Sequence, residues 1–313
     1  MIRMTSHETT YYSHTPVLLY ESTTQLVTNP AGIYIDATLG GGGHAAEILS
    51  RLNKNGRLIG IDQDDEALAA ARSNIGTDPR FSTIKGNFGY LSRLVPPELH
   101  GKISGILLDL GVSTHQIKES ERGFSFQKDG PLDMRMGNLR GLTAYQIVNN
   151  YSYEDLRDVI FHYGEEKLSR QIADAIINER PIETTMQLRK VIESVVHGPH
   201  QIKSVARVFQ GIRIAVNGEL DMLRAVLEQG LEIMEIGGHF VAISYHSLED
   251  RIVKRFFKAG NHTGQVKKDF YGHEISPIRS LSNGIIRPSE DEIEKNSAAR
   301  SAKMRVAEKI KEV

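Results

Sequence analysis

The chain has 313 residues, of which 40% are hydrophobic and 25% charged, and its formal net charge is −1. This composition is typical of a globular enzyme with one large domain or two modest ones. Cysteine is absent, which excludes disulfides and cysteine-ligated zinc or iron–sulfur centres. Because the sequence shows neither a bilayer-spanning apolar run nor the layout of a signal peptide, we expect a cytoplasmic protein without membrane contact.

Strand and helix patterns alternate along the first part of the chain. The expected elements are a strand at 32–36, a helix at 43–53, a strand at 57–61, a helix at 64–75, and strands at 81–85 and 103–110. This alternation predicts an α/β fold with a doubly wound parallel sheet. Ligands bind such sheets at the carboxyl ends of the strands. Four candidate ligand groups lie at these ends: Asp36, Asp62, Phe88 and Asp109.

Residues 36–44 (DATLGGGGH) form the most informative local pattern. An acid ends the first strand, and four glycines then lead into the start of a helix. Glycines let backbone N–H groups approach a bound molecule, and the first helical turn adds free amide donors. Asp62 ends the next strand, where a doubly wound sheet holds a pair of ribose hydroxyls. The two acids and the glycines together predict a cofactor site.

The identity of the cofactor depends on Asp36, because Asp62 suits both NAD and S-adenosylmethionine (SAM). A carboxylate at the glycine turn would repel a pyrophosphate, whereas it would attract the ammonium and sulfonium groups of SAM. The pattern therefore favours SAM. The alternatives are an NAD-dependent oxidoreductase and a tightly packed strand–helix turn that binds nothing.

The alternation stops after His115. Four helical patterns follow, at 153–163, 168–179, 185–196 and 203–218. They predict an inserted all-helical subdomain at 115–211, serving substrate recognition or acting as a lid. The sheet-bearing domain would then consist of 1–114 and 212–313. It resumes with a helix at 219–236, a fifth strand at 238–245 and weak strand patterns at 278–286 and 304–309.

The charge is unevenly distributed. From Arg251 onward the chain has 14 Lys and Arg against 8 Asp and Glu, although the whole chain is almost neutral. A local excess of cations suits contact with phosphates. The alternative is a solvated, lysine-rich tail.

Six motifs resemble the small-subunit ribosomal RNA methyltransferase H family, also called MraW. They are 14–21 (HTPVLLYE), 36–44 (DATLGGGGH), 107–113 (LLDLGVS), 121–126 (ERGFSF), 130–136 (GPLDMRM) and 244–254 (SYHSLEDRIVK). The resemblance covers nearly the whole chain, from His14 to Lys309. It implies a Rossmann-like, SAM-dependent methyltransferase with an inserted helical subdomain. The implied reaction is methylation of the exocyclic N4 of a cytidine in 16S rRNA, in the P-site region of the decoding centre of the small ribosomal subunit.

The resemblance also implies roles for individual residues. Gly42, Gly43 and His44 correspond to the residues that contact the methionine part of SAM. Asp62 corresponds to the ribose ligand and Phe88 to the aromatic residue against the adenine. Asp109 and Gln116 complete the implied cofactor site.

The N4 amine of cytosine is a poor nucleophile, because its lone pair is delocalised into the ring. A hydrogen-bond acceptor for the N4 protons would localise the lone pair and stabilise the positive charge that develops. Asp109 is the first candidate, with cofactor contact alone as its competing role. His246 and Glu249 are second candidates, and the alternative for His246 is a helix cap. We expect no metal, because SAM supplies its own electrophile and the histidines lack metal-ligand spacing. Amino-methylating DNA enzymes carry a Pro-Pro motif where this chain reads DLGV at 109–112, so their catalytic arrangement does not transfer by position.

The sequence leaves the substrate contacts and several rival functions open. Candidate RNA contacts are Arg122, Arg135, Arg251, Lys254 and Arg255, with Phe124 and Phe126 available for base stacking or for core packing. The rivals are a SAM-dependent methyltransferase acting on a protein or small molecule, and a ribosome-assembly factor that binds SAM without catalysis. The oligomeric state, monomer or homodimer, is also open.

Overall fold

The computed structural model describes residues 16–113, 116–117, 119–137, 141–281 and 284–312. His14, His115 and the domain boundary predicted between 114 and 115 lie outside the described residues. Among the described helices, none combines the length and hydropathy of a membrane span.

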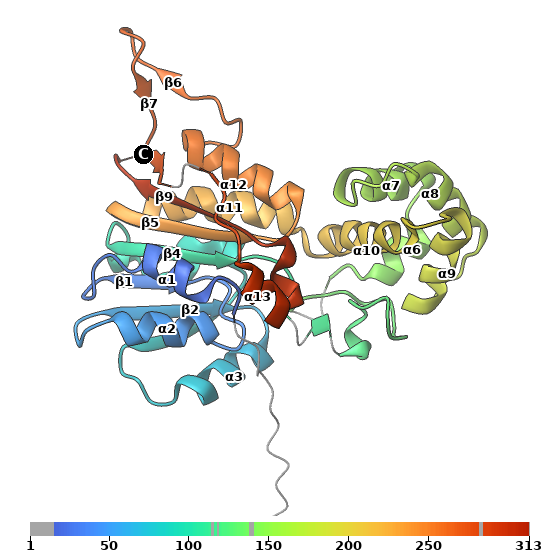
Figure 1. Ribbon diagram of the computed structural model, residues 1–313, viewed down its shortest axis with the longest axis horizontal. Helices are drawn as coiled ribbons and strands as arrows, with labels where there is room; N and C mark the ends of the chain where they lie inside the picture. Colours follow the sequence, from blue (N-terminus) through green and yellow to red (C-terminus); the bar gives the residue numbers. More distant parts are fainter. Residues whose placement is uncertain (1–15, 114–115, 118, 138–140, 282–283, 313) are drawn as a thin grey trace, which may run out of the picture.

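Seven strands form one mixed sheet in the order β3-β2-β1-β4-β5-β9-β8 (Figure 1). The strands are β1 (Ile33–Asp36), β2 (Arg57–Asp62), β3 (Phe81–Lys85), β4 (Ile103–Asp109), β5 (Met234–Ser244), β8 (Ile278–Ser280) and β9 (Lys303–Lys309). β1 to β5 run parallel, whereas β9 is antiparallel to β5 and to β8. The predicted α/β fold is therefore confirmed, including the final pair of strands.

Helices cover both faces of this sheet, and a group of further helices lies beyond one end of it (Figure 1). Those around the sheet are α1 (Leu19–Leu26), α2 (Gly43–Arg51), α3 (Asp65–Ile75), α4 (Leu91–Leu94), α11 (Glu219–Ile233), α12 (Ser247–Ala259) and α13 (Glu290–Lys295). Those beyond its end are α6 (Ala144–Asn150), α7 (Tyr153–Asp158), α8 (Ser169–Asn178), α9 (Thr185–Val195) and α10 (Gln201–Asn217). Short helical turns are η1 (Phe88–Tyr90), η2 (Pro97–Leu99), η3 (Ser120–Arg122), η4 (Val159–Tyr163) and η5 (Ser297–Ser301).

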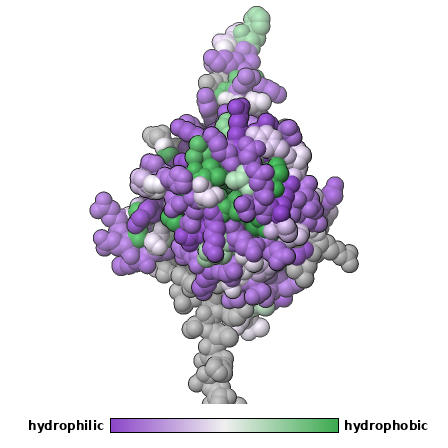
Figure 2. All heavy atoms as spheres, turned by 90° about the vertical axis from the view of Figure 1, so that its right-hand side faces the viewer, coloured by the Kyte–Doolittle hydropathy of each residue, from purple (hydrophilic) through white to green (hydrophobic). Residues whose placement is uncertain are grey.

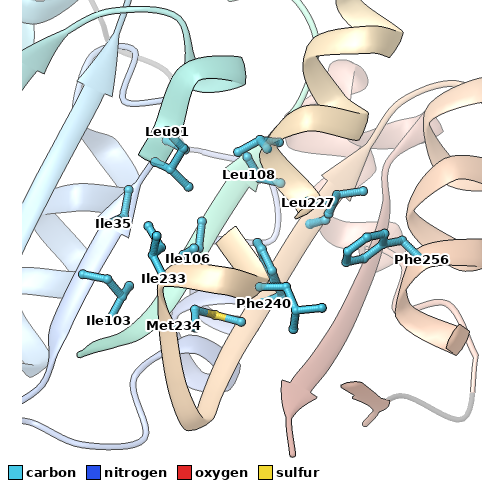
Figure 3. Close-up of a cluster of buried hydrophobic side chains, with 14 of the residues drawn as sticks. Ile35, Leu91, Ile103, Ile106, Leu108, Leu227, Ile233, Met234, Phe240 and Phe256 are labelled. Carbon is cyan, nitrogen blue, oxygen red and sulfur yellow. The ribbon is translucent and has the colours of Figure 1, made fainter. Parts of the chain in front are cut away.

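The core lies on both faces of the sheet because successive strand residues point to opposite sides. Ile35 and Ile106 belong to the cluster between the sheet and α4, α11 and α12, where Phe240 and Leu227 also pack (Figure 3). Their neighbours, such as Leu107, pack with α1, α2 and α3. Burial on both faces explains why the central strands read as nearly continuous apolar runs.

The helices α6 to α10 have a hydrophobic cluster of their own, which includes Ile147, Ile172, Leu188 and Ile212. Two of these helices begin with a capping box. It is formed by Thr143 and Gln146 at the start of α6, and by Thr184 and Gln187 at the start of α9. The predicted boundary between 211 and 212 falls inside α10, which continues to Asn217. The helix ends there because Gly218 adopts the left-handed conformation that terminates helices.

The structure differs from the sequence-based boundaries at the start of β5. α11 ends at Ile233 and β5 begins at Met234, whereas we expected the helix to continue to 236 and the strand to start at 238. Ile233 and Met234 are both buried, so the apolar spacing of the helix runs on into the strand. A register shift against β4 and the positive φ of Gly237 (+88°) mark the irregular entry.

Candidate active site

A cavity of about 740 Å³ lies where the carboxyl ends of β1, β2 and β4 meet the start of α2. This volume is within the range of small-molecule sites, roughly 300–1,000 Å³. The strand order reverses between β1 and β4, which is where doubly wound sheets bind ligands. The cavity brings together every predicted cofactor residue except Asp36, namely Gly42, Gly43, His44, Asp62, Phe88, Asp109 and Gln116.

The glycine turn has a geometry that side chains would disturb. Gly42 is the N-cap of α2 with φ +83°, a backbone region that favours glycine. At Gly43 an added Cβ would lie 2.3 Å from Cγ of Pro16. The side chain of Asn74 donates to the carbonyl of Gly41 (2.9 Å) and fixes the turn from outside. The start of α2, with its free amide groups, therefore opens onto the cavity.

Asp62 ties the end of β2 to the glycine turn. One carboxylate oxygen accepts the N–H of Gly40 (2.9 Å), and the other accepts the N–H of Asp64 (2.9 Å). Burial raises the pKa of Asp62, although these backbone hydrogen bonds oppose the rise. A carboxylate offers about four acceptor positions, more than these backbone contacts use, so it has capacity to accept a ribose hydroxyl. The ribose role stays a prediction.

Asp36 lies behind the cavity wall, which is formed at this strand by Ala37 and Thr38. Its side chain is only 1% exposed, and Oδ1 accepts the N–H of Thr38 (3.2 Å). Oδ2 is buried and has no hydrogen-bond partner among the described residues. Burial raises the pKa of Asp36 to about 7, and the nearby carboxylates of Asp109 and Asp62 add to the rise. A cation in the cavity would therefore reduce a real electrostatic cost.

Asp109 ends β4 and lines the cavity. Its Oδ1 accepts the hydroxyl of Tyr245 (2.8 Å), and its backbone N–H donates to Oγ1 of Thr38 (2.7 Å). Burial raises the pKa of Asp109 to about 7; the Tyr245 hydrogen bond opposes the rise and the carboxylate of Glu249 adds to it. A carboxyl group that titrates near neutrality is suited to take up and release a proton.

His44 faces Asp109 as a neutral imidazole. Its Nε2 lies 3.2 Å from the carbonyl of Val17, which assigns the proton to Nε2. Nδ1 lies 3.8 Å from Oδ2 of Asp109. Burial lowers the pKa of His44 to about 4, so the ring carries no charge near neutral pH. His44 therefore gives Asp109 no cationic partner, which is consistent with the raised pKa of that carboxyl group.

His246 caps α12 and is not part of the cavity lining formed by the described residues. Its Nδ1 accepts the N–H of Glu249, and Oε2 of Glu249 accepts the backbone N–H groups of Tyr245 (2.9 Å) and His246 (3.3 Å). Burial raises the pKa of Glu249, but His246, Arg213 and the Tyr245 amide outweigh it and leave the pKa below its usual value. This capping box holds Tyr245 in place, so Tyr245 rather than His246 reaches the cavity.

One group of side chains in the described residues has spacing that a metal ion could use: Glu219, His246 and Glu249. Arg213 already occupies this position as a cation. Its guanidinium donates to both carboxylate oxygens of Glu219 at 2.8 Å, and the charges of Glu219 and Glu249 raise its pKa. A metal would have to compete with this half-buried guanidinium for Glu219, so the group does not fit a metal site.

Two further contacts connect the cavity to the segment before α6. Gln116 accepts the N–H of Ser113 (3.0 Å) and donates to the carbonyl of Met136 (3.2 Å). Arg122 pairs with Asp64 (3.2 Å) and donates to the carbonyl of Met136 (3.3 Å). Arg122 therefore joins this segment to the turn after β2.

Several of the candidate RNA contacts have partners within the protein. Phe124 and Phe126 pack in the cluster of the α6 to α10 helices, where Phe126 meets Phe209 edge-on at 5.5 Å. Arg135 pairs with Asp133, and Arg251 pairs with Glu165 (3.0 Å). The core-packing alternative therefore describes both aromatic residues.

The lining residues that the sequence reasoning missed include Tyr245 and Arg213. Tyr245 stands in the motif 244–254, directly after β5, so its place at a strand end was a usable signal. Arg213 lies in the interior of α10 and has no local sequence signal, because only the packing of α10 brings it to the cavity.

The chain matches the model of the MraW methylase family over residues 11–310. The chain belongs to the MraW methylase family. It is accordingly a methyltransferase, and the sequence-based identification of the family is confirmed.

Two relatives illustrate the similarity. The chain is 46% identical over 309 residues to "Ribosomal RNA small subunit methyltransferase H" of Bacteroides fragilis (strain YCH46), which covers 98% of this chain and 100% of that protein. It is 47% identical over 307 residues to the protein of the same name from Flavobacterium johnsoniae, covering 96% and 99%. Among solved structures, an rRNA methylase from Streptococcus thermophilus aligns over 92% of both chains at 12% identity, with a TM-score of 0.38.

Proposed function

We propose that this member of the MraW methylase family transfers a methyl group from SAM to the exocyclic N4 of a cytidine in the RNA of the small ribosomal subunit, 16S rRNA in bacteria. The family match and the names of the relatives support methylation of small-subunit rRNA. The observation that carries the N4 assignment is Asp109, a cavity carboxyl group whose pKa is raised to about 7.

The cavity fits SAM. The glycine turn gives free amide groups, and Asp62 has lone pairs for ribose hydroxyls. Oδ2 of Asp36 has no hydrogen-bond partner in the described part of the chain, and this is an electrostatic cost that a cationic cofactor would reduce and a pyrophosphate would increase. We therefore assign Gly42, Gly43 and His44 to the methionine part, Asp62 to the ribose, Phe88 to the adenine and Gln116 to the remaining wall. Bound SAM would supply a methyl group on a positively charged sulfur, which makes it the electrophile.

We assign Asp109 as the acceptor for a proton of the N4 amine. A hydrogen bond from the amine to this carboxylate would localise the lone pair of the nitrogen and stabilise the positive charge that develops on it. Tyr245 fixes the carboxylate by its hydrogen bond to Oδ1, and the backbone N–H to Thr38 fixes the end of β4. Tyr245 is thus a positioning residue. His246 keeps the role of helix cap.

The helices between 115 and 211 are the proposed recognition or lid subdomain for RNA. Arg122 and Gln116 connect the segment before α6 to the cavity wall, so RNA bound to this unit would be near the cofactor. We propose a cytoplasmic enzyme, because its ribosomal substrate is there, and a reaction without a metal, because the sulfonium is itself the electrophile. Both the monomer and the homodimer are compatible with this function.

The test is to incubate the protein with methyl-labelled SAM and small ribosomal subunits, and to digest the RNA to nucleosides. We expect the label in N4-methylcytidine. Label in ribosomal protein, in a small molecule or in another nucleoside would contradict the proposal, and an absence of transfer despite SAM binding would favour a non-catalytic assembly factor.

A further inference from the structure

A β-hairpin projects from the body of the protein after α12 (Figure 1). It consists of β6 (Lys267–Lys268) and β7 (Glu274–Ile275), joined by a turn at 269–273. Two aromatic side chains are almost fully exposed in this turn, Phe270 at 98% and Tyr271 at 81%. Figure 2 shows a hydrophobic group at the very end of this projection, with hydrophilic residues along much of its length. Large aromatic residues exposed at the end of a projection are typical of contact sites.

The turn is held in one shape by its own hydrogen bonds. One carboxylate oxygen of Asp269 accepts the N–H groups of Tyr271 (2.9 Å) and His273 (2.8 Å), and the other oxygen lies 3.0 Å from Nδ1 of His273. Gly272, with φ +86°, closes the turn. The rings of Phe270 and Tyr271 meet edge-on at 5.6 Å. The aromatic pair is therefore presented in a preorganised arrangement.

A series of cations leads from the active site to this tip. α12 begins beside the cavity, and its exposed face carries Arg251, Lys254, Arg255 and Lys258 at helical spacing. The hairpin continues the series with the exposed Lys267 and Lys268. The acids beside this series are fewer than its six cations: Glu165 pairs with Arg251, Asp269 is used by the turn itself, and Glu274 stands opposite Lys268 in the hairpin register, so positive charge is in excess.

The length of α12 sets the distance that a ligand must span. Its 13 residues cover about 20 Å at 1.5 Å per residue, and the hairpin extends further. A ligand that occupies both the cavity and the tip must therefore be long and negatively charged. Single-stranded RNA is recognised by this combination of cations along the backbone and aromatic rings for its bases.

We propose that the hairpin is a second RNA-binding site, at which Phe270 and Tyr271 stack on unpaired bases of small-subunit rRNA while Lys267 and Lys268 contact its phosphates. This inference rests on the proposed function and adds a contact remote from the methylated nucleotide. The exposed face of α12 connects the two sites.

The experiment measures the affinity of the protein for protein-free small-subunit rRNA at several salt concentrations. The variant Phe270→Ala/Tyr271→Ala removes both rings and should bind at least about tenfold more weakly, because each stacked base alone contributes on the order of tenfold to the affinity. The variant Lys267→Gln/Lys268→Gln should show a shallower dependence of affinity on salt, by about one to two phosphate contacts. SAM affinity should be unchanged in both variants.

Two matched controls separate stacking from a general loss of surface. Phe270→Tyr/Tyr271→Phe keeps both rings and should keep the wild-type affinity. Ile236→Ala removes another exposed hydrophobic side chain, 56% exposed, and should have no effect.

Three outcomes would overturn the inference. The first is wild-type affinity of the alanine variant for the protein-free RNA. The second is a loss of binding seen only with complete subunits, which would assign the hairpin to a ribosomal protein. The third is binding of the aromatic tip to anionic phospholipid vesicles without a contribution to RNA binding. None of these outcomes affects whether the wild-type protein forms N4-methylcytidine. The proposed function is therefore tested independently of the hairpin.

Discussion

The chemistry proposed for this methyltransferase depends on acids at strand ends, of which Asp36 is buried and Asp109 partly buried. Asp36 and Asp109 both have a pKa raised to about 7, mainly because burial disfavours their charged forms. They differ in access. Asp109 lines the cavity, whereas Asp36 lies behind its wall. Because of this difference in access, we assign an electrostatic role to Asp36 and proton transfer to Asp109.

Replacement of Asp62 tests the cofactor site. Asp62→Ala removes a carboxylate proposed to accept ribose hydroxyls, and we expect SAM affinity to fall by about 1.5–3 kcal/mol, the size of lost charge-assisted hydrogen bonds. Calorimetric titration with SAM measures the change. Because Asp62 also anchors Gly40, melting of the variant without SAM must be measured as a control. Unchanged affinity in a folded variant would contradict the ribose assignment.

Replacement of Tyr245 tests how Asp109 is tuned. The Tyr245 hydroxyl lowers the pKa of Asp109 by its hydrogen bond to the carboxylate. Tyr245→Phe should therefore raise this pKa, and the acid limb of the rate of methyl transfer should move to higher pH. The pH dependence of single-turnover transfer measures the shift. An unchanged or lower midpoint would show that the Tyr245 hydroxyl does not lower the pKa of the carboxyl group that limits the rate.

At the scale of elements, the glycine turn is shaped by packing against the N-terminal segment. Gly43→Ala would place a Cβ 2.3 Å from Cγ of Pro16, and overpacking of this kind costs about 1–3 kcal/mol. We expect lower thermal stability and weaker SAM binding. The double variant Gly43→Ala/Pro16→Ala removes the opposing ring and should recover part of the loss. Equal losses in the single and double variants would locate the effect elsewhere.

The alternating elements, the sheet and the residues at its strand ends could be predicted from the sequence because each rests on a local pattern. The end of α11 could not be predicted, because the buried Ile233 and Met234 continue the apolar spacing of the helix into β5. The same limit applies to the site. Asp62 and Asp109 have local signals, whereas Arg213 reaches the cavity only through the packing of α10. Phe124 and Phe126 were ambiguous in sequence because stacking and core residues look alike.

At the scale of the whole molecule, Asp36 and Asp109 make stability depend on pH. Their pKa values are near 4 in the unfolded chain and about 7 in the folded protein, so the folded state binds more protons between these values. Their contribution to stability is therefore lost as pH rises from about 4 to 7. His44 has the opposite effect, because its pKa is lowered to about 4.

A comparison of variants separates the pH dependence of stability due to the two acids from that due to His44. Asparagine cannot ionise, so Asp36→Asn/Asp109→Asn should gain stability relative to the wild type as pH rises towards 7 and beyond. Denaturant unfolding without SAM, at a series of pH values, measures the difference. A difference that stays constant with pH would show that the two carboxyl groups do not titrate in this range.

The most direct test of the central claim is single-turnover methyl transfer to small ribosomal subunits by the wild type and by Asp109→Asn, on both sides of pH 7. If Asp109 accepts the N4 proton, the wild-type rate rises to a plateau with a midpoint at or below about 7, since a bound cation lowers the pKa of a neighbouring acid. The variant should be slower by a factor of about 100 or more and lack this limb, while its SAM affinity changes little. A variant with near wild-type rate and weakened SAM binding would assign Asp109 to cofactor contact and contradict the account.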